Sequence, residues 1–111
     1  PSGIILKVSL YNPDESWPDN RIEDDAAKDL RFGGRQGEIQ EAVFGNLTIQ
    51  QVGTIFQAGD PLEPTRYKAH RAHITGGDGR LDLLVKGLES ESLQIDDFWQ
   101  QLMTSLVAVK K

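Results

Sequence analysis

Two histidines, His70 and His73, are candidates for binding a metal ion because imidazole nitrogen is a common metal ligand. Positions three apart would share one face of a helix. The alternating pattern around them instead predicts a strand, in which such positions point to opposite faces. They could share an ion only across a bulge. We therefore expect His70 to pack beside Val85 and His73 to pair with Asp82, with no metal site.

Six carboxylates gather in a short acidic segment near the N-terminus. Hard divalent cations prefer several oxygen ligands, so the segment can be interpreted as a cation site. Its spacing matches no calcium loop, and no glycine stands where such a loop turns. Runs of charge usually mark solvated surface, so we interpret this segment as a solvated loop and helix start. Its members are Asp14, Glu15, Asp19, Glu23, Asp24 and Asp25.

Residues 64–88 are locally positive, with five basic and two acidic side chains. Basic groups around an aromatic ring can hold a single-stranded nucleic acid and stack a base. The formal net charge of −5 opposes this, since phosphate contacts favour a basic protein. The alternative is a solvent-exposed strand edge, where lysine discourages aggregation. The candidate interaction surface is Arg66, Tyr67, Lys68, Arg71, His73, Arg80, Leu84 and Lys86.

The glycine-rich segment Phe32–Glu38 does not have the composition of a nucleotide-binding loop. It contains neither the lysine nor the Ser/Thr of such a loop, and no helix pattern follows it. A plain turn into the next strand is the simpler interpretation. No Ser/His/Asp arrangement or carboxylate pair supports catalysis. We expect no cofactor, and an enzyme of unknown type remains only a general alternative.

Length and composition indicate a single domain spanning 1–111. The charged share of 26% and the hydrophobic share of 38% are ordinary for a globular protein. Without cysteine the chain has no disulfides, thiol nucleophiles or cysteine metal ligands. No apolar run is long enough to cross a bilayer and no signal peptide is recognisable, so we expect a cytoplasmic protein with no membrane partner.

Two turns organise the expected sheet. Gly45-Asn46 suits a two-residue hairpin with a positive φ, pairing Phe44 with Leu47. Gly77-Asp78 suits a second hairpin, placing Ile74 opposite Leu81 and Leu83 opposite Ala72. Alternating apolar residues predict a further strand near the N-terminus. The fold class is α+β, with an antiparallel meander of about five strands at 3–11, 38–44, 47–57, 65–75 and 80–88.

The C-terminal segment 95–109 has apolar residues at helical spacing around Trp99. We expect this amphipathic helix to cover the sheet face that carries Leu81, Leu83 and Val85. The segment 21–31 also allows a short helix, with Ile22, Ala26 and Leu30 on one stripe.

The second sheet face also carries apolar residues, at Leu84, Val52 and Ile39. One helix cannot easily cover both faces. An uncovered apolar face predicts a protein interface, most simply a homodimer, unless the 21–31 helix covers it. We therefore predict a small non-enzymatic binding or regulatory module that works through protein contacts and self-associates. The alternative is a single-strand nucleic-acid binder that uses the basic strand 66–73.

Overall fold

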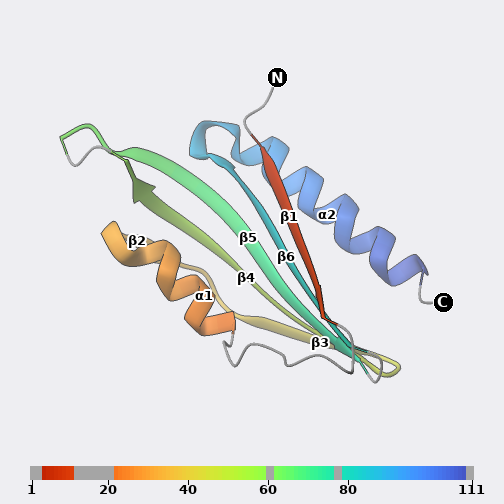
Figure 1. Ribbon diagram of the computed structural model, residues 1–111. Helices are drawn as coiled ribbons and strands as arrows, with labels where there is room; N and C mark the ends of the chain where they lie inside the picture. Colours follow the sequence, from red (N-terminus) through yellow and green to blue (C-terminus); the bar gives the residue numbers. More distant parts are fainter. Residues whose placement is uncertain (1–3, 12–21, 60–61, 77–78, 110–111) are drawn as a thin grey trace.

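The computed structural model describes residues 4–11, 22–59, 62–76 and 79–109 of the chain (Figure 1). Within these residues the protein is one six-stranded antiparallel sheet with a helix on each face, which confirms the α+β class. The helices are α1 (Ile22–Asp29) and α2 (Ser92–Val109). The strands are β1 (Ile5–Tyr11), β2 (Gly34–Gln36), β3 (Gln40–Phe44), β4 (Leu47–Ala58), β5 (Thr65–Gly76) and β6 (Gly79–Leu88).

The β3–β4 hairpin has the predicted register. Phe44 lies opposite Leu47, and Gly45 adopts a φ of 63° at the turn. A positive φ is costly for residues with a side chain but not for glycine, so Gly45 fixes where the two strands meet.

The β5–β6 hairpin also has the predicted register. Ile74 lies opposite Leu81, and His73 lies opposite Asp82. The turn residues Gly77 and Asp78 lie outside the described residues. Long strands on both sides of the turn give this hairpin a continuous ladder from Gly76↔Gly79 to Tyr67↔Leu88.

Strand β1 completes the sheet beside β6, at the end of the sheet away from β3. The strand order is β1-β6-β5-β4-β2, with β3 also paired to β4. The consecutive meander therefore runs through β3, β4, β5 and β6, and β1 adds to its far side. Val8 lies opposite Leu83, on the sheet face that α2 covers. Among the described strands, β6 is the sole sheet neighbour of β1.

The segment predicted to be a plain turn forms a short strand instead. Residues Gly34–Gln36 pair with β4 in antiparallel register, Gly34 opposite Phe56. Gly34 has a φ of 138°, and a Cβ placed on it would lie 2.2 Å from the carbonyl oxygen of Ile55. Only glycine permits this approach of two backbones. The sequence shows no apolar alternation there that would have revealed the strand.

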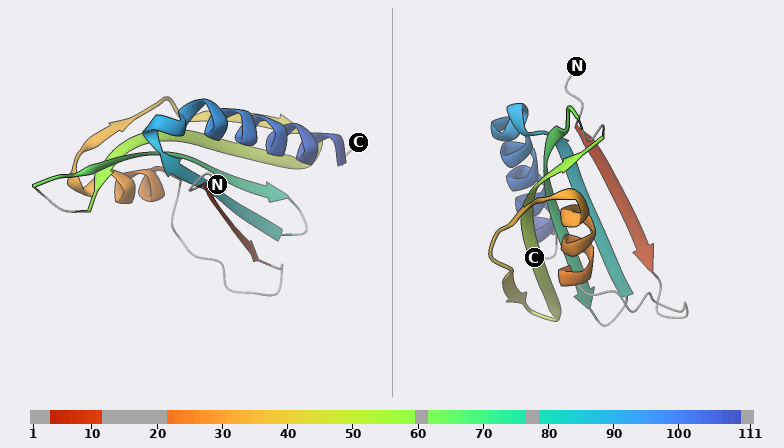
Figure 2. Two further views of the ribbon diagram at one scale, coloured as in Figure 1. Left: turned by 90° about the horizontal axis from the view of Figure 1, so that it is seen from above. Right: turned by 90° about the vertical axis from the view of Figure 1, so that its left-hand side faces the viewer.

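The two helices lie on opposite faces of the sheet (Figure 2). Each helix covers a separate apolar cluster. The smaller cluster joins α1 to β4. Of the two alternatives, the 21–31 helix covers the second face, so that face is not the uncovered apolar surface from which a homodimer was expected. Its buried members are Ile22, Ala26 and Val52, with Ile39 packed beside them. The larger cluster joins α2 to β4, β5 and β6. Its buried members are Ile49, Ala72, Ile74, Leu83, Val85, Ile95, Trp99 and Met103.

Helix α2 covers the predicted face, with Ile95, Trp99 and Met103 pointing into the larger cluster. Phe98, an apolar residue next to Trp99 in this helix, is 39% exposed. Side chains beyond Ser105 lie outside the described part. None of the described helices is long and apolar enough to cross a membrane.

Candidate functional site

The eight predicted surface residues do not form one patch. Alternation along β5 places Arg66 and Lys68 on the α2 side of the sheet, and Tyr67, Arg71 and His73 on the α1 side. Strand β5 lies between β4 and β6, so the interpretation of this stretch as a sheet edge is wrong. The remaining three residues, Arg80, Leu84 and Lys86, belong to β6 and face the α1 side.

The basic side chains of this set already contact carboxylates or an aromatic ring. The nitrogen-to-oxygen distances are 3.3 Å from Arg66 to Glu89, 2.7 Å from Lys68 to Asp96 and 2.8 Å from Arg71 to Asp29. Arg80 forms an ion pair with Asp82, and the Lys86 ammonium lies 5.7 Å from the centre of the Tyr67 ring. A nucleic-acid phosphate would have to displace these partners, which weakens the support for single-strand binding.

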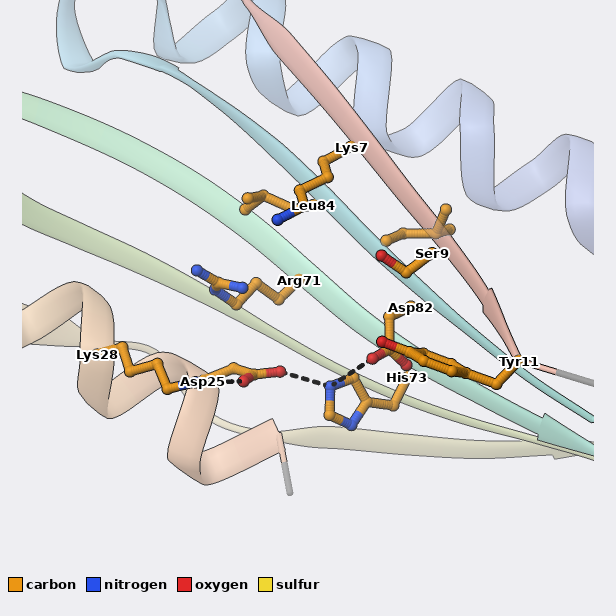
Figure 3. A pocket seen from close by; sticks show the side chains of 10 residues that line it. Lys7, Ser9, Tyr11, Asp25, Lys28, Arg71, His73, Asp82 and Leu84 are labelled. Carbon is orange, nitrogen blue, oxygen red and sulfur yellow. Dashed lines mark hydrogen bonds and ion pairs between the residues drawn. The ribbon is translucent and has the colours of Figure 1, made fainter. Parts of the chain in front are cut away.

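A polar pocket opens on the α1 side, between α1 and strands β5, β6 and β1 (Figure 3). Its volume is about 370 Å³. Four of its charged or titratable side chains, Arg71, His73, Asp25 and Lys28, line the side nearer α1. The full lining is Lys7, Ser9, Tyr11, Asp25, Lys28, Arg71, His73, Asp82, Leu83 and Leu84.

Helix α1 supplies two carboxylates from the same stripe that carries its apolar contacts. Positions Ile22, Asp25, Ala26 and Asp29 recur at helical spacing, so all four face the sheet. The Asp29 carboxylate accepts hydrogen bonds from both Nε (2.9 Å) and Nη2 (2.8 Å) of Arg71. The helix therefore docks through alternating apolar and ionic contacts.

The most buried polar side chains of the pocket form a cluster centred on His73. Its Nε2 lies 2.7 Å from Oδ2 of Asp25 and 3.8 Å from Oδ2 of Asp82. Ionised carboxylates only accept hydrogen bonds, so the Nε2–H donates to Asp25. Asp25 is 8% exposed, which corrects the expectation that the whole acidic segment is solvated. The other acidic positions at 14, 15 and 19 lie outside the described residues.

Arg80 holds the second carboxylate of this cluster in place. Its Nε lies 2.7 Å from Oδ1 of Asp82, and its Nη2 lies 2.8 Å from Oδ2. The same Nη2 is 3.4 Å from both ring nitrogens of His73, so the guanidinium approaches the imidazole over its ring. The ring of Tyr11 lies against the guanidinium, 5.7 Å from its carbon to the ring centre.

The two arginines of this region stay cationic. The hydrogen bond to Asp29 raises the pKa of Arg71 despite burial, and the hydrogen bond to Asp82 does the same for the pKa of Arg80. Each is held by a bidentate contact, the strongest geometry for an arginine and a carboxylate. They therefore act as fixed charges that orient Asp29 and Asp82.

His70 lies on the opposite face, as the strand pattern predicts. Its ring stacks on Trp99 at a centroid distance of 5.3 Å, and its Nε2 lies 2.8 Å from Oδ1 of Asp96. Lys68 contacts the same carboxylate. Burial alone would raise the pKa of Asp96, but the hydrogen bonds from His70 and Lys68 outweigh it and lower the pKa. The two histidines therefore serve separate networks.

Several residues of the pocket were not singled out from the sequence. Lys7, Ser9 and Tyr11 reach it because β1 pairs with β6, a long-range contact that no local pattern reveals. Asp25, named only as part of the acidic segment, and Asp29, which binds Arg71 beside the pocket, both carried a signal. They stand three and seven positions after Ile22, on the predicted apolar stripe, where a solvated carboxylate is not expected.

Strand β1 presents a second feature, an exposed apolar row on the α2 side of the sheet. Leu6, Val8 and Leu10 are 44%, 54% and 67% exposed. Their partners in β6 are Val85, Leu83 and Leu81, of which the first two are buried beneath α2. The helix thus covers β5 and β6 and leaves the β1 row open.

No protein-family model, curated protein or solved structure matches this chain. Function must therefore be inferred from the residues and their geometry.

Proposed function

We propose that the protein is a small binding module that self-associates, and that its interface is the outer edge of β1. The observation that carries this proposal is the exposed row Leu6, Val8 and Leu10 on an edge strand. Natural edge strands are usually protected by charges, bulges or covering segments, because their unpaired backbone groups template pairing. Residues Ile5–Tyr11 contain one charged side chain, Lys7, and pair with β6 without a break in register.

The occupant that fits this edge best is a second copy of β1, related by a two-fold axis. In an antiparallel self-pair centred on Val8, Leu6 lies opposite Leu10 of the partner subunit, and Lys7 lies opposite Ser9 of the partner subunit. In this register all seven residues of β1 are paired with residues of the second copy. The apolar row then continues from one copy of β1 to the other. A pair centred on Lys7 would place two ammonium groups opposite each other, which is unfavourable. A pair centred on Ser9 would leave Ile5 and Leu6 unpaired.

Cysteine cross-linking tests this register, since the native chain contains no cysteine. Opposed residues in an antiparallel pair have Cα atoms about 4.5–5.5 Å apart, within the range of about 4.4–6.8 Å for a disulfide. Val8→Cys, on the axis, should form a covalent dimer on mild oxidation. Leu10→Cys alone should not, because each copy lies opposite Leu6 and the two copies of position 10 are therefore four residues apart along the paired strands. A mixture of Leu6→Cys and Leu10→Cys should cross-link again.

A charge placed in the row should dissociate the dimer. We expect Val8→Lys to sediment as a monomer at concentrations where the wild type sediments as a dimer, because it sets two ammonium groups together at the axis. Val43→Lys is the matched control, since Val43 is similarly exposed, at 64%, on β3 at the other end of the sheet. A wild-type monomer at millimolar concentration, or dissociation by Val43→Lys instead, would refute the proposal.

A further inference from the structure

The cluster around His73 brings three possible metal ligands together from three separate elements. Asp25 comes from α1, His73 from β5 and Asp82 from β6. One donor atom from each lies within 4.8 Å of the other two. The side chains of Asp25 and His73 are 11% and 7% exposed. A preformed, largely buried set of this kind needs little ordering to bind an ion.

The distances are close to those a small divalent ion requires. Zinc bonds of about 2.0–2.2 Å in tetrahedral geometry place neighbouring ligand atoms about 3.3–3.6 Å apart. The separations from Nε2 of His73 are 2.7 Å to Asp25 and 3.8 Å to Asp82, on either side of that range. The Asp25 and Asp82 oxygens lie within 4.8 Å of each other, so shifts of about 1 Å would bring all three donors onto one ion.

The charges around the cluster also accommodate an ion. Two carboxylates face the same imidazole nitrogen, which has a single proton to donate. A divalent cation in place of that proton would contact both carboxylates. Lys28 approaches the other oxygen of Asp25, Oδ1, at 3.9 Å, and leaves Oδ2 directed at His73. Arg80 donates to both oxygens of Asp82, as a residue that orients a ligating carboxylate does, and its Nη2, which lies 3.4 Å from Nε2 of His73, would have to move away from that nitrogen as the ion enters.

The pocket beside the cluster provides the remaining coordination positions. Its volume of about 370 Å³ admits water or a small ligand next to the three donors. Figure 3 shows Asp25 and Asp82 approaching His73 from different sides, with the ring between α1 and β1. An imidazole with two carboxylates suits a transition metal better than Ca²⁺ or Mg²⁺, which prefer an all-oxygen shell.

We propose that Asp25, His73 and Asp82 form a binding site for a divalent transition metal such as Zn²⁺, with open positions facing the pocket. The bound ion would tie α1 to β5 and β6, and its open positions would receive water or an anionic group of a small ligand. This site is independent of pairing through β1.

Titration of the wild-type protein with Zn²⁺ alone, followed by calorimetry, tests the proposal. We expect one ion per chain and at least about tenfold weaker binding of Ca²⁺. His73→Gln keeps a hydrogen-bond donor for Asp25 but removes the imidazole, and should weaken Zn²⁺ binding about tenfold or more. His70→Gln is the matched control, because His70 lies on the same strand and contacts a single aspartate, Asp96. This control should bind Zn²⁺ as the wild type does.

A nuclear magnetic resonance measurement on the wild type covers the case in which His73→Gln fails to fold. Zn²⁺ should shift the Nε2 resonance of His73 and leave that of His70 in place. The proposal is overturned if the wild type does not bind Zn²⁺. It is equally overturned if folded His73→Gln binds Zn²⁺ unchanged, or if the shift appears at His70 alone.

Discussion

Trp99 is the residue that connects the larger core to the polar surface of the sheet. Its side chain is 4% exposed within the cluster that includes Leu83 and Val85. Its indole Nε1 donates a hydrogen bond of 3.0 Å to Oε1 of Gln51, and its ring stacks on His70. A buried tryptophan usually needs such a partner for its N–H, so packing and hydrogen bonding reinforce each other here.

Replacing Trp99 by alanine should cost about 3–5 kcal/mol of unfolding free energy, because it leaves a large cavity and removes the partner of Gln51. Urea unfolding followed by far-ultraviolet circular dichroism measures this. Phe98→Ala is the control on the same helix, and should cost much less since Phe98 is 39% exposed. Equal losses in the two variants would show that the indole does not anchor the core.

Each helix is held on the sheet by carboxylates as well as by apolar side chains. Asp96 joins the first half of α2 to Lys68 and His70 of β5. Asp29 joins the end of α1 to Arg71 of the same strand. Hydrophobic packing is non-directional, whereas these hydrogen bonds fix the rotation and position of each helix. Strand β5 is therefore the element to which both helices are oriented.

The contact between α2 and β5 should make stability depend on acid pH. Because the folded-state pKa of Asp96 is lowered, its contribution is fully present above the unfolded-state value of about 3.9 and is lost as pH falls through the folded value. Asp96→Asn should therefore destabilise the protein at pH 5–8, by an amount that shrinks as the pH falls below about 3.9. The effect should stay below about 1 kcal/mol, because the Asp96 side chain is 45% exposed.

Asp97→Asn provides the comparison for this pH series. Asp97 stands in the same helical turn and contacts Gln101 on its own helix, with a hydrogen bond of 2.9 Å. Its substitution should leave the helix–sheet contact intact, so its unfolding midpoint should follow the wild type across the pH range. The assignment would be contradicted if the two variants gave the same pH profile.

At the scale of the whole molecule, the central meander and the α2 layer could be predicted from sequence because their signals are local. Gly45 marks a turn by its tolerance of positive φ, and alternation around Leu83 marks the buried face. The pocket could not be predicted, since Asp25 and His73 are 48 positions apart in the sequence and meet only when α1 docks. The run of charges around residue 25 indicated that its side chain is exposed to solvent. Only its helical spacing from Ile22 indicated that the side chain faces the sheet.

The unequal sizes of the two cores indicate that the layers have unequal stability. Eight buried residues form the cluster under α2, whereas three form the cluster under α1. Elements with fewer buried apolar contacts open more often, without global unfolding. Amides of α1 should therefore exchange with deuterium at lower opening free energies than those of β5, β6 and the segment 95–103 of α2.

Native-state hydrogen exchange at increasing urea measures these opening energies directly. We expect the α1 amides to exchange through a local opening that is insensitive to denaturant, and the β5 and β6 amides through global unfolding. If α1 exchanged only with global unfolding, then the ionic contacts of Asp25 and Asp29 would compensate for its small apolar cluster. The docking of α1 would then depend mainly on its polar side chains, and Asp29→Asn should expose the difference by lowering α1 protection alone.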